Sequence, residues 1–510
     1  MRGDFMRMAT PTIRIIYKNW GGRDVVAEEL SKALVNKEKV AEFWRSIRQQ
    51  VETEFAPYVS ALADAVVSGH KSGGIEAAKE AAYKYFSRAT YGKKKLAKML
   101  LPEASESLQH KRNAMLKFSR MPLLTCPGAD VCGAHCYALH GHYSKEMVKK
   151  SIMRQDAFVQ LLIDEVKKRV GGDPALAAGL VGAALAGAVE AAGDAEVVRL
   201  HDSGDFNDPI YAAAWMTAAK LLPNRWFYTY TKTFPNVNVR VWGDAVQYYR
   251  RLFGEGPPKN FAVNISATSA NFFLLPKAAE EFANLGVQTP GVFFYAPGNM
   301  AAYYRDEDWK KLAESLVEAA RRTAGKKLIL EIEHGLGSGR SAKSAAALPR
   351  VVEEVVKYAQ SAGIPLRVVV PTTAYKVVEP DKKQQGGVLI DEEKTQALRE
   401  VANMLETMGL RRMDTSEGSW TKKVGGREFQ MSRDVAVFEV PGAGEPVEVF
   451  VEPGGEKACT LCRRCVIADY SPQKTFKIKL TSAAVPTVAE ETPQPQRKKR
   501  RRKRKKAVAV

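Results

Sequence analysis

Cysteine and histidine are scarce in this sequence, which has six cysteines and seven histidines among 510 residues. A small secreted domain held together by disulfides uses cysteine far more densely, so that class is excluded. The N-terminus lacks the continuous apolar stretch of a signal peptide. The longest apolar run, residues 175–189, is short and rich in Ala and Gly, which is typical of a packed helix rather than a membrane span. We therefore expect a soluble, cytoplasmic protein with no membrane association.

Acidic residues are in the minority, with 57 Asp and Glu against 77 Lys and Arg, and the net charge is +20. Hydrophobic residues make up 45% of the chain, which excludes a disordered protein. Half of the excess charge lies in one basic run. A run of this kind repels itself and binds phosphate backbones, so we expect a disordered tail that contacts nucleic acid. The run consists of Arg497, Lys498, Lys499, Arg500, Arg501, Arg502, Lys503, Arg504, Lys505 and Lys506.

Four regions follow from the changes of pattern along the chain. Residues 1–110 repeat apolar residues at helical spacing, interrupted at Gly73-Gly74, and predict a helical region. Residues 111–410 alternate short β-branched or aromatic runs with helical segments. Residues 411–480 predict a small subdomain of strands and loops, and residues 481–510 are the expected disordered tail.

The region 111–410 predicts an α/β fold built from βαβ units with a parallel sheet. Six strands are expected within residues 197–206, 225–232, 260–269, 291–298, 327–335 and 366–374, and a seventh just before Cys126. This number suits a complete or partial (βα) barrel of the TIM type, and a doubly wound open sheet is the alternative. Several of these strands end in polar residues, which favours the barrel, because its catalytic residues gather at the carboxyl ends of the strands.

All six cysteines fall into two tight triplets, and this clustering indicates metal binding. Cys126, Cys132 and Cys136 supply three thiolates from a loop that contains Gly and Pro. Three thiolates can hold a [4Fe-4S] cluster with one iron open to a ligand, as in radical S-adenosylmethionine enzymes, although the spacing is not their usual C-x3-C-x2-C. With His135, His140 or His142 the same loop could instead form a Cys3His Zn²⁺ site.

The second triplet is Cys459, Cys462 and Cys465. Its spacing repeats the first three positions of the bacterial ferredoxin pattern C-x2-C-x2-C-x3-C-P, and Asp469 stands at the fourth position. We therefore expect one or two iron–sulfur clusters, with zinc as the alternative.

The segment RLHDSGDFNDPIYAAAW, residues 199–215, is dense in chemically active residues at the end of a strand. Asp208 before Pro209 is typical of a helix N-cap and is expected to be structural. His201, Asp205 and, from the next strand, Lys232 are the candidate catalytic residues. Ser203, Gly204 and Asp205 stand where radical S-adenosylmethionine barrels bind the methionine amino group, so they are the candidate cofactor-binding residues.

The chain resembles the phage gene product 88 family over roughly residues 115–470. The resemblance rests on CPGADVCGAHCYA, VRLHDSGDF, RWFYTYTKT, the SATS segment and the terminal CTLCRRC. It implies a protein of a phage or related mobile element in which both cysteine triplets belong to one domain.

Together these patterns predict an iron–sulfur, radical S-adenosylmethionine-like enzyme that acts on a nucleic-acid or nucleotide-derived substrate, and such a cluster implies a redox partner. Two alternatives belong to other classes. One is a zinc-stabilised nucleic-acid-binding protein without catalysis, and the other is an electron carrier with two clusters. The sequence carries no signal for an oligomeric state.

Overall fold

The structure of the chain is a computed structural model. It describes residues 16, 18, 20, 24–102, 115–129, 133, 136–139, 141–237, 239–268, 270–295, 304–331, 341–378, 387–424 and 427–452. All of these belong to one compact unit, Met1–Tyr470. The second cysteine triplet, Asp469 and the basic run lie outside the described residues.

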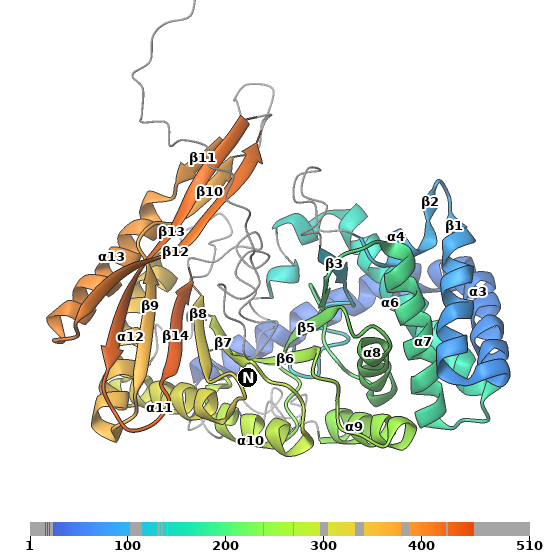
Figure 1. Ribbon diagram of the computed structural model, residues 1–510, viewed down its shortest axis with the longest axis horizontal. Helices are drawn as coiled ribbons and strands as arrows, with labels where there is room; N and C mark the ends of the chain where they lie inside the picture. Colours follow the sequence, from blue (N-terminus) through green and yellow to red (C-terminus); the bar gives the residue numbers. More distant parts are fainter. Residues whose placement is uncertain are drawn as a thin grey trace, which may run out of the picture. The chain divides into compact units, whose positions relative to one another are not determined.

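The helices and strands follow the predicted pattern (Figure 1). The helices are α3 (Asp24–Arg88), α4 (Leu96–Leu100), α6 (Glu146–Arg169), α7 (Pro174–Ala192), α8 (Pro209–Leu221), α9 (Val239–Phe253), α10 (Leu275–Leu285), α11 (Asp306–Arg322), α12 (Ser341–Ala362) and α13 (Glu392–Thr407), with short 3-10 helices η3 (Tyr137–Leu139), η4 (Gly141–Ser144) and η5 (Phe272–Leu274). The strands are β1 (Thr90–Tyr91), β2 (Lys94–Lys95), β3 (Met115–Phe118), β4 (Val197–Leu200), β5 (Trp226–Thr231), β6 (Phe261–Ala267), β7 (Gly291–Tyr295), β8 (Lys327–Glu331), β9 (Leu366–Pro371), β10 (Tyr375–Val378), β11 (Gly387–Ile390), β12 (Arg412–Val424), β13 (Arg427–Val440) and β14 (Val447–Glu452).

One ten-stranded sheet organises the described chain, in the order β12-β13-β9-β14-β8-β7-β6-β5-β4-β3. The strands β3 to β8 follow chain order and are all parallel, and β14 lies parallel between β8 and β9. Only β13 and β12 run antiparallel to their neighbours. The fold is therefore mixed α/β with a large, mostly parallel sheet. Because β3 and β12 are its two edges, this sheet is open, and it does not form the complete barrel that the sequence led us to expect.

Helices cover one face of this sheet. Consecutive parallel strands joined by right-handed crossovers place their connecting helices on the same side, and α8, α9, α10 and α11 contact one another in turn (Figure 1). Their apolar residues form the main core with alternate strand residues such as Val198, Phe227 and Leu328. The intervening strand residues point to the opposite face, where Tyr228, Phe293 and other side chains form two smaller clusters. In this article the two sides are called the helix-covered face and the opposite face.

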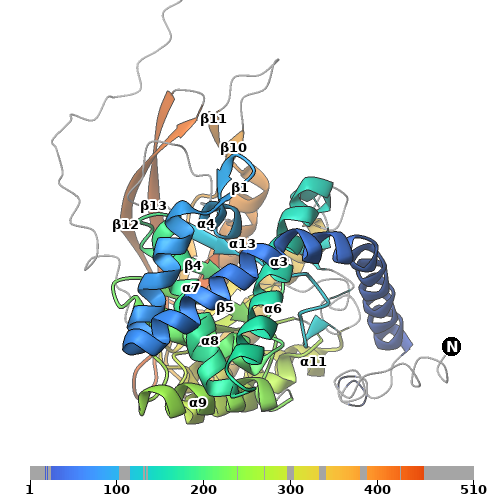
Figure 2. The ribbon, with the colours of Figure 1, turned by 90° about the vertical axis from the view of Figure 1, so that its right-hand side faces the viewer.

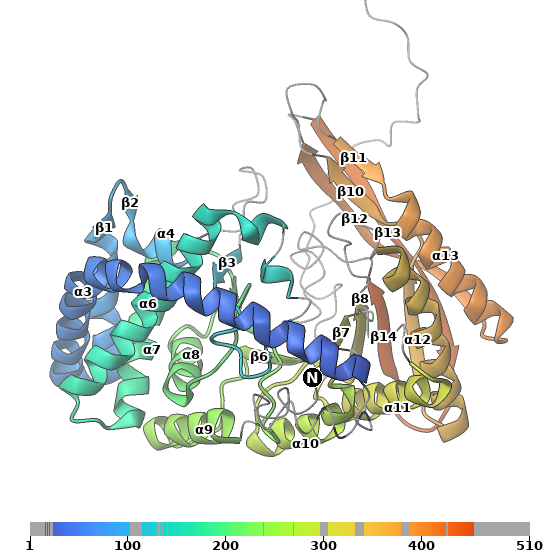
Figure 3. The same ribbon diagram turned by 180° about the vertical axis from the view of Figure 1, so that it is seen from behind.

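The regions expected at the two ends of the chain are joined to this core. The long helix α3 bends at Gly73 and Gly74, as the sequence indicated, and packs against α6 and α7 (Figure 3). At the other end, β13 pairs with β9 and β14 pairs with β8. Residues 412–452 therefore extend the main sheet instead of forming a separate subdomain.

Helix α7 is the one helix of the described chain that has the length and hydropathy of a membrane span, and 83% of it is buried. Asp173 caps its N-terminus by accepting hydrogen bonds from the backbone N–H groups of Ala175 and Leu176. Its Ala and Gly residues allow close packing: a Cβ atom at Gly182 would lie 2.6 Å from the Ala214 carbonyl oxygen on α8. The helix is buried in the core, as its composition predicted.

Candidate functional site

The carboxyl ends of β4, β5 and β6 meet the loop that carries the first cysteine triplet. Asp205, after β4, accepts a hydrogen bond from the backbone N–H of Lys232, after β5, at 2.8 Å. The Lys232 ammonium donates to the Ser266 hydroxyl on β6 at 3.0 Å. Gly128 packs directly onto the Lys232 backbone, because a Cβ atom there would lie 2.5 Å from the Lys232 carbonyl oxygen. Three strand ends and the cysteine loop therefore form one continuous site.

His201 is buried within this site on the helix-covered side. Its Nδ1 lies 3.1 Å from the Thr229 hydroxyl, and its Nε2 lies 2.9 Å from the Tyr211 hydroxyl. Burial, together with the charge of Arg120, lowers the pKa of His201 well below its ordinary value of 6.5. The backbone of His201 has a φ of 60°, in the left-handed region that is uncommon for residues other than glycine. A neutral imidazole with both nitrogens engaged inside the core favours a structural role, so its catalytic role stays a prediction.

Ser203, Gly204 and Asp205 also bind inside the chain. The Ser203 hydroxyl donates to the Arg120 carbonyl oxygen at 2.8 Å. Gly204 has a φ of 84°, and a Cβ atom there would lie 2.6 Å from the Arg120 Cβ, so this position requires glycine.

The Asp205 carboxylate accepts three hydrogen bonds, from the Phe206 and Lys232 backbone N–H groups and from the Thr231 hydroxyl. Burial raises the pKa of Asp205, and these hydrogen bonds oppose that shift. The three residues connect β4 to β5, and their predicted cofactor-binding role stays a prediction.

A cluster of charges lies beside them, where strand ends reach the opposite face. Asp202 lies 3.3 Å from Arg199 and 3.5 Å from Lys117, and it accepts a hydrogen bond from the Tyr143 hydroxyl at 2.8 Å. Burial tends to raise the pKa of Asp202, but the charges of Arg199 and Lys117 lower it below its ordinary value. Asp202 is therefore a buried carboxylate between two cations, held by η4 of the cysteine loop.

Aromatic side chains continue this surface along the opposite face. The Tyr230 ring on β5 lies 4.8 Å from the Phe293 ring on β7, centroid to centroid. The Arg199 guanidinium lies 5.9 Å from the centre of the Tyr230 ring, within the range of a cation–π contact. Neighbouring strands thus present cations and aromatic rings side by side, next to Lys232 and Ser266.

Arg120 is the central residue of the site's interior, and sequence reasoning did not identify it. Its side chain is 1% exposed and forms an ion pair with Asp156 of α6. It also donates to Asn207 at 2.7 Å and lies over the Tyr211 ring at 4.4 Å. The charge of Asp156 outweighs burial and raises the pKa of Arg120, so it stays a cation. It joins the segment before the cysteine loop to α6 and α8.

Two of the three cysteines in the first triplet are among the described residues. Cys126 and Cys136 are both partly buried. Between them, Gly133 packs against α3: a Cβ atom there would lie 3.0 Å from the Ala33 Cβ, and Asn36 donates to the Gly133 carbonyl oxygen at 2.9 Å. Cys132, His135, His140 and the side chain of His142 lie outside the described residues. Within the described part of the chain, no three His, Cys, Asp or Glu side chains are grouped so as to hold a metal ion.

Other residues that the sequence singled out are placed as follows. Asp208 caps α8 by accepting a hydrogen bond from the Tyr211 backbone N–H at 3.0 Å, as predicted. The structure adds Lys117 and Arg199, which sequence reasoning missed. Each is the single charged residue within a short apolar strand, in MLKF and VVRL. A charge inside a buried strand is rare unless it is paired, so this signal could have found both residues.

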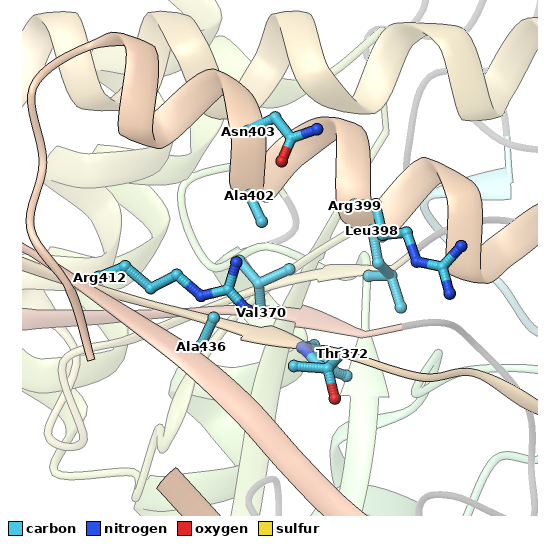
Figure 4. A pocket seen from close by; sticks show the side chains of 9 residues that line it. Val370, Thr372, Leu398, Arg399, Ala402, Asn403, Arg412 and Ala436 are labelled. Atoms are coloured by element: carbon cyan, nitrogen blue, oxygen red, sulfur yellow. The ribbon is translucent and has the colours of Figure 1, made fainter. Parts of the chain in front are cut away.

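A separate cavity of about 420 Å³ lies between α13 and the sheet (Figure 4). Val370, Leu398, Ala402 and Ala436 form its apolar part. The polar residues around it are Thr372, Arg399, Asn403 and Arg412. The Arg412 guanidinium forms ion pairs with Glu406 and Asp414. This cavity is on the helix-covered face and is distinct from the site at the cysteine loop.

Comparisons with known proteins relate one part of the chain to a family. No curated protein and no solved structure matches the chain. A model of the family described as Gene product 88 matches residues 86–292. This range begins and ends earlier than the range of about 115–470 that the motifs indicated, and it does not reach the second triplet. The chain is therefore similar to the phage gene product 88 family over the part that carries the first triplet, β3 to β6 and Lys232.

Proposed function

We propose that the chain is an iron–sulfur protein in which Cys126, Cys132 and Cys136 hold a cluster at the carboxyl ends of β4 and β5. In this proposal it is a radical S-adenosylmethionine-like enzyme for a nucleic-acid or nucleotide-derived substrate. The observation that carries the proposal is the packing of Gly128 onto Lys232. This contact brings a loop with cysteine thiols to the strand ends where parallel α/β enzymes place their catalytic groups.

The donor chemistry of the loop fits a cluster. Cys126 and Cys136 are partly buried at its two ends, and Cys132 lies between them in the sequence. Thiolates are the usual ligands of iron–sulfur clusters. When bound, a cluster with three thiolate ligands offers one iron to a further ligand such as S-adenosylmethionine. The chain-ordered parallel strands β3 to β8 are also compatible with a partial (βα) barrel.

The opposite face fits an anionic aromatic substrate. Lys117, Arg199 and Lys232 supply positive charge, and Tyr230 with Phe293 supplies ring surfaces for stacking. A nucleotide carries both a phosphate and an aromatic base. In this arrangement Lys232 contacts the substrate. Asp205 and His201 act as positioning residues, because their partners are the backbone of Lys232 and hydroxyl groups inside the core.

The second triplet is proposed to hold an auxiliary cluster at the same edge of the sheet. β14 is parallel to β8 and ends at Glu452, opposite Glu331, so the chain leaves β14 at the carboxyl edge. Cys459 follows seven residues later, and seven extended residues span about 25 Å. β14 is four strands from β5, about 19 Å at about 4.8 Å per strand. The two triplets are therefore within reach of each other.

The test is anaerobic purification with analysis of iron, acid-labile sulfide and zinc, together with a visible absorption spectrum. A brown protein with iron and sulfide is expected, because thiolate-to-iron charge transfer absorbs visible light and Zn²⁺ gives no such band. Alanine substitution of the first triplet, Cys126, Cys132 and Cys136, should remove its share of the iron. The same substitution of the second triplet measures the other share.

Met147→Ala is the control, because it removes a sulfur-containing side chain near the loop that is 84% exposed. It should leave the iron content unchanged. A colourless protein with stoichiometric zinc would contradict the cluster and favour the zinc-stabilised nucleic-acid-binding protein. Iron that persists when the first triplet is replaced would contradict the location of the site.

A further inference from the structure

The outer part of the β12–β13 hairpin is a two-stranded ribbon. β13 pairs with β9 only from Val435 to Val440, whereas its pairing with β12 continues outward to Arg427. Residues 419–424 of β12 and 427–432 of β13 therefore pair only with each other. The ribbon extends the main sheet beyond β9.

The strand register assigns each ribbon residue to a face. Val435 and Val437 belong to the cluster on the opposite face, with Phe293 and Phe450. Successive residues of a strand alternate between faces, and directly paired residues share a face. Counting outward from Val435 in steps of two, and adding the cross-strand partners, places six ribbon residues on the opposite face: Trp420, Lys422, Val424, Arg427, Phe429 and Met431.

The two faces of the ribbon differ sharply in composition. The opposite face has two aromatic residues and two cations, and it has no Asp or Glu among its six positions. The other face has Ser419, Thr421, Lys423, Glu428, Gln430 and Ser432, in which Lys423 is paired with Glu428 across the strands. Charge and aromatic residues are thus concentrated on one side only.

The neighbouring elements lie on the other side of the ribbon. Leu398 and Leu405 of α13 pack into the main core, which is on the helix-covered face. The β10 end is joined to α13 by the hydrogen bond from the Ala374 backbone N–H to the Thr395 hydroxyl. Figure 2 shows β10, β11 and α13 on the same side of β12 and β13. At the base of the ribbon, Met413, the partner of Val437, is 38% exposed.

We propose that the opposite face of the β12–β13 ribbon binds single-stranded nucleic acid. Aromatic residues interspersed with cations suit this ligand, because bases stack on the rings while Lys and Arg neutralise the phosphates. The absence of acidic residues on this face of the ribbon removes the repulsion that phosphates would otherwise meet. A duplex hides its base faces, so single strands are the expected form.

The ribbon face is continuous with the proposed substrate site. From β13 to β5 the sheet order has six steps, about 29 Å at about 4.8 Å per step. A single strand on the ribbon could therefore run along the same face of the sheet toward Tyr230 and Lys232. The binding site itself rests on the register and not on the metal, so it goes beyond the proposed iron–sulfur function and can be tested separately.

The experiment compares two probes on the full chain: an oligothymidylate and an abasic oligomer of the same length. Both carry the same phosphate charge, so binding by the basic run contributes equally to both. The wild-type protein should prefer the oligothymidylate, because only that probe has bases to stack. Trp420→Ala and Phe429→Ala should each reduce this preference by about 5- to 150-fold and leave abasic binding nearly unchanged.

The paired residues Thr421 and Gln430 on the other face provide the matched controls. Thr421→Ala and Gln430→Ala should keep the full preference. For charge, Lys422→Ala should lower the salt dependence of binding more than Lys423→Ala, its neighbour on the other face. Equal wild-type binding of the two probes, or an equal loss in the controls, would overturn the proposal. Circular dichroism and iron content of each variant verify the fold and separate this result from a failure of the iron–sulfur proposal.

Discussion

The side chain of His201 shows how a single residue links the site to the stability of the fold. It lies between Thr229 and Tyr211, and no carboxylate faces its ring to stabilise a positive charge among its printed contacts. The folded protein keeps this imidazole neutral, whereas the unfolded chain protonates it near pH 6.5. The unfolded state therefore binds more protons than the folded state below that pH, and acidification favours unfolding.

We predict that this histidine makes the free energy of unfolding fall as the pH drops below about 6.5. One proton accounts for at most about 1.4 kcal/mol per pH unit. His201→Asn should remove this contribution while it retains the left-handed backbone that asparagine tolerates. Urea unfolding across this pH interval measures the slope.

Substitution of His70, which is half-buried in α3, serves as the comparison for that experiment. Asp205 acts with the opposite sign: its pKa is raised, so its protonation favours the folded state at lower pH. An unchanged slope in His201→Asn would contradict the assignment of a neutral buried histidine.

Residues of the site differ in how visible they are in the sequence. The cysteines, Lys232 and the His201–Asp205 segment stand out because their residue types cluster at the end of a strand. Arg120 does not stand out, because its meaning depends on Asp156, 36 positions away, and on Asn207, 87 positions away. No local pattern reports such contacts.

At the scale of elements, α3 is the unexpected neighbour of the cysteine loop. Its residues Val40, Phe43 and Trp44 pack with Met121 before the loop and with Met153 of α6. Ala33 and Asn36 contact Gly133 inside the loop. The helical N-terminal region, to which the sequence assigned no purpose, therefore helps to hold the first triplet in position.

We predict that Ala33→Phe displaces the loop and lowers the retention of iron by the first triplet. Ala33 is 4% exposed and its Cβ faces Gly133, so a phenyl ring has no room there. Val35→Phe is the control, because Val35 lies on the same stretch of helix and is 53% exposed. Iron content after gel filtration measures the effect. Equal iron contents in the two variants would show that α3 does not support the loop.

Strands and helices themselves were largely readable from the sequence. All seven strands expected in the region 111–410 are present as β3 to β9, because each is a short apolar run between Gly, Pro or polar residues. The hairpin β10–β11 and most of β12 were not expected. β12 contains Thr, Ser, Lys and a Glu-Gly irregularity, so it has no apolar alternation to reveal it.

At the scale of the whole molecule, charge is the property that the sequence reports directly. Arg497 to Lys506 carry ten of the twenty net positive charges. We predict that deletion of residues 497–506 weakens nonspecific binding to both duplex and single strands and reduces its dependence on salt, because fewer counterions are released. Affinities measured over a salt series provide the test. Identical salt slopes for the full and truncated chains would rule out a nucleic-acid tether.

The truncation also separates two kinds of binding. The tail acts through phosphates, so its loss should affect the oligothymidylate and the abasic oligomer equally. The ribbon preference for bases should survive, and the iron content should not change. A truncated protein that loses the preference for bases would show that the ribbon does not act alone.

The sequence by itself determined where most strands and helices occur, which residues carry metal-binding chemistry, and where the excess charge lies, because periodicity, residue type and charge are local properties. Only the tertiary structure decided that the sheet is open, that β14 lies between β8 and β9, and that Gly128 packs on Lys232. A βαβ repeat has the same local pattern in a closed barrel and in an open sheet. The difference depends on pairing between strands that are distant in sequence, and that pairing is decided by packing of the whole chain.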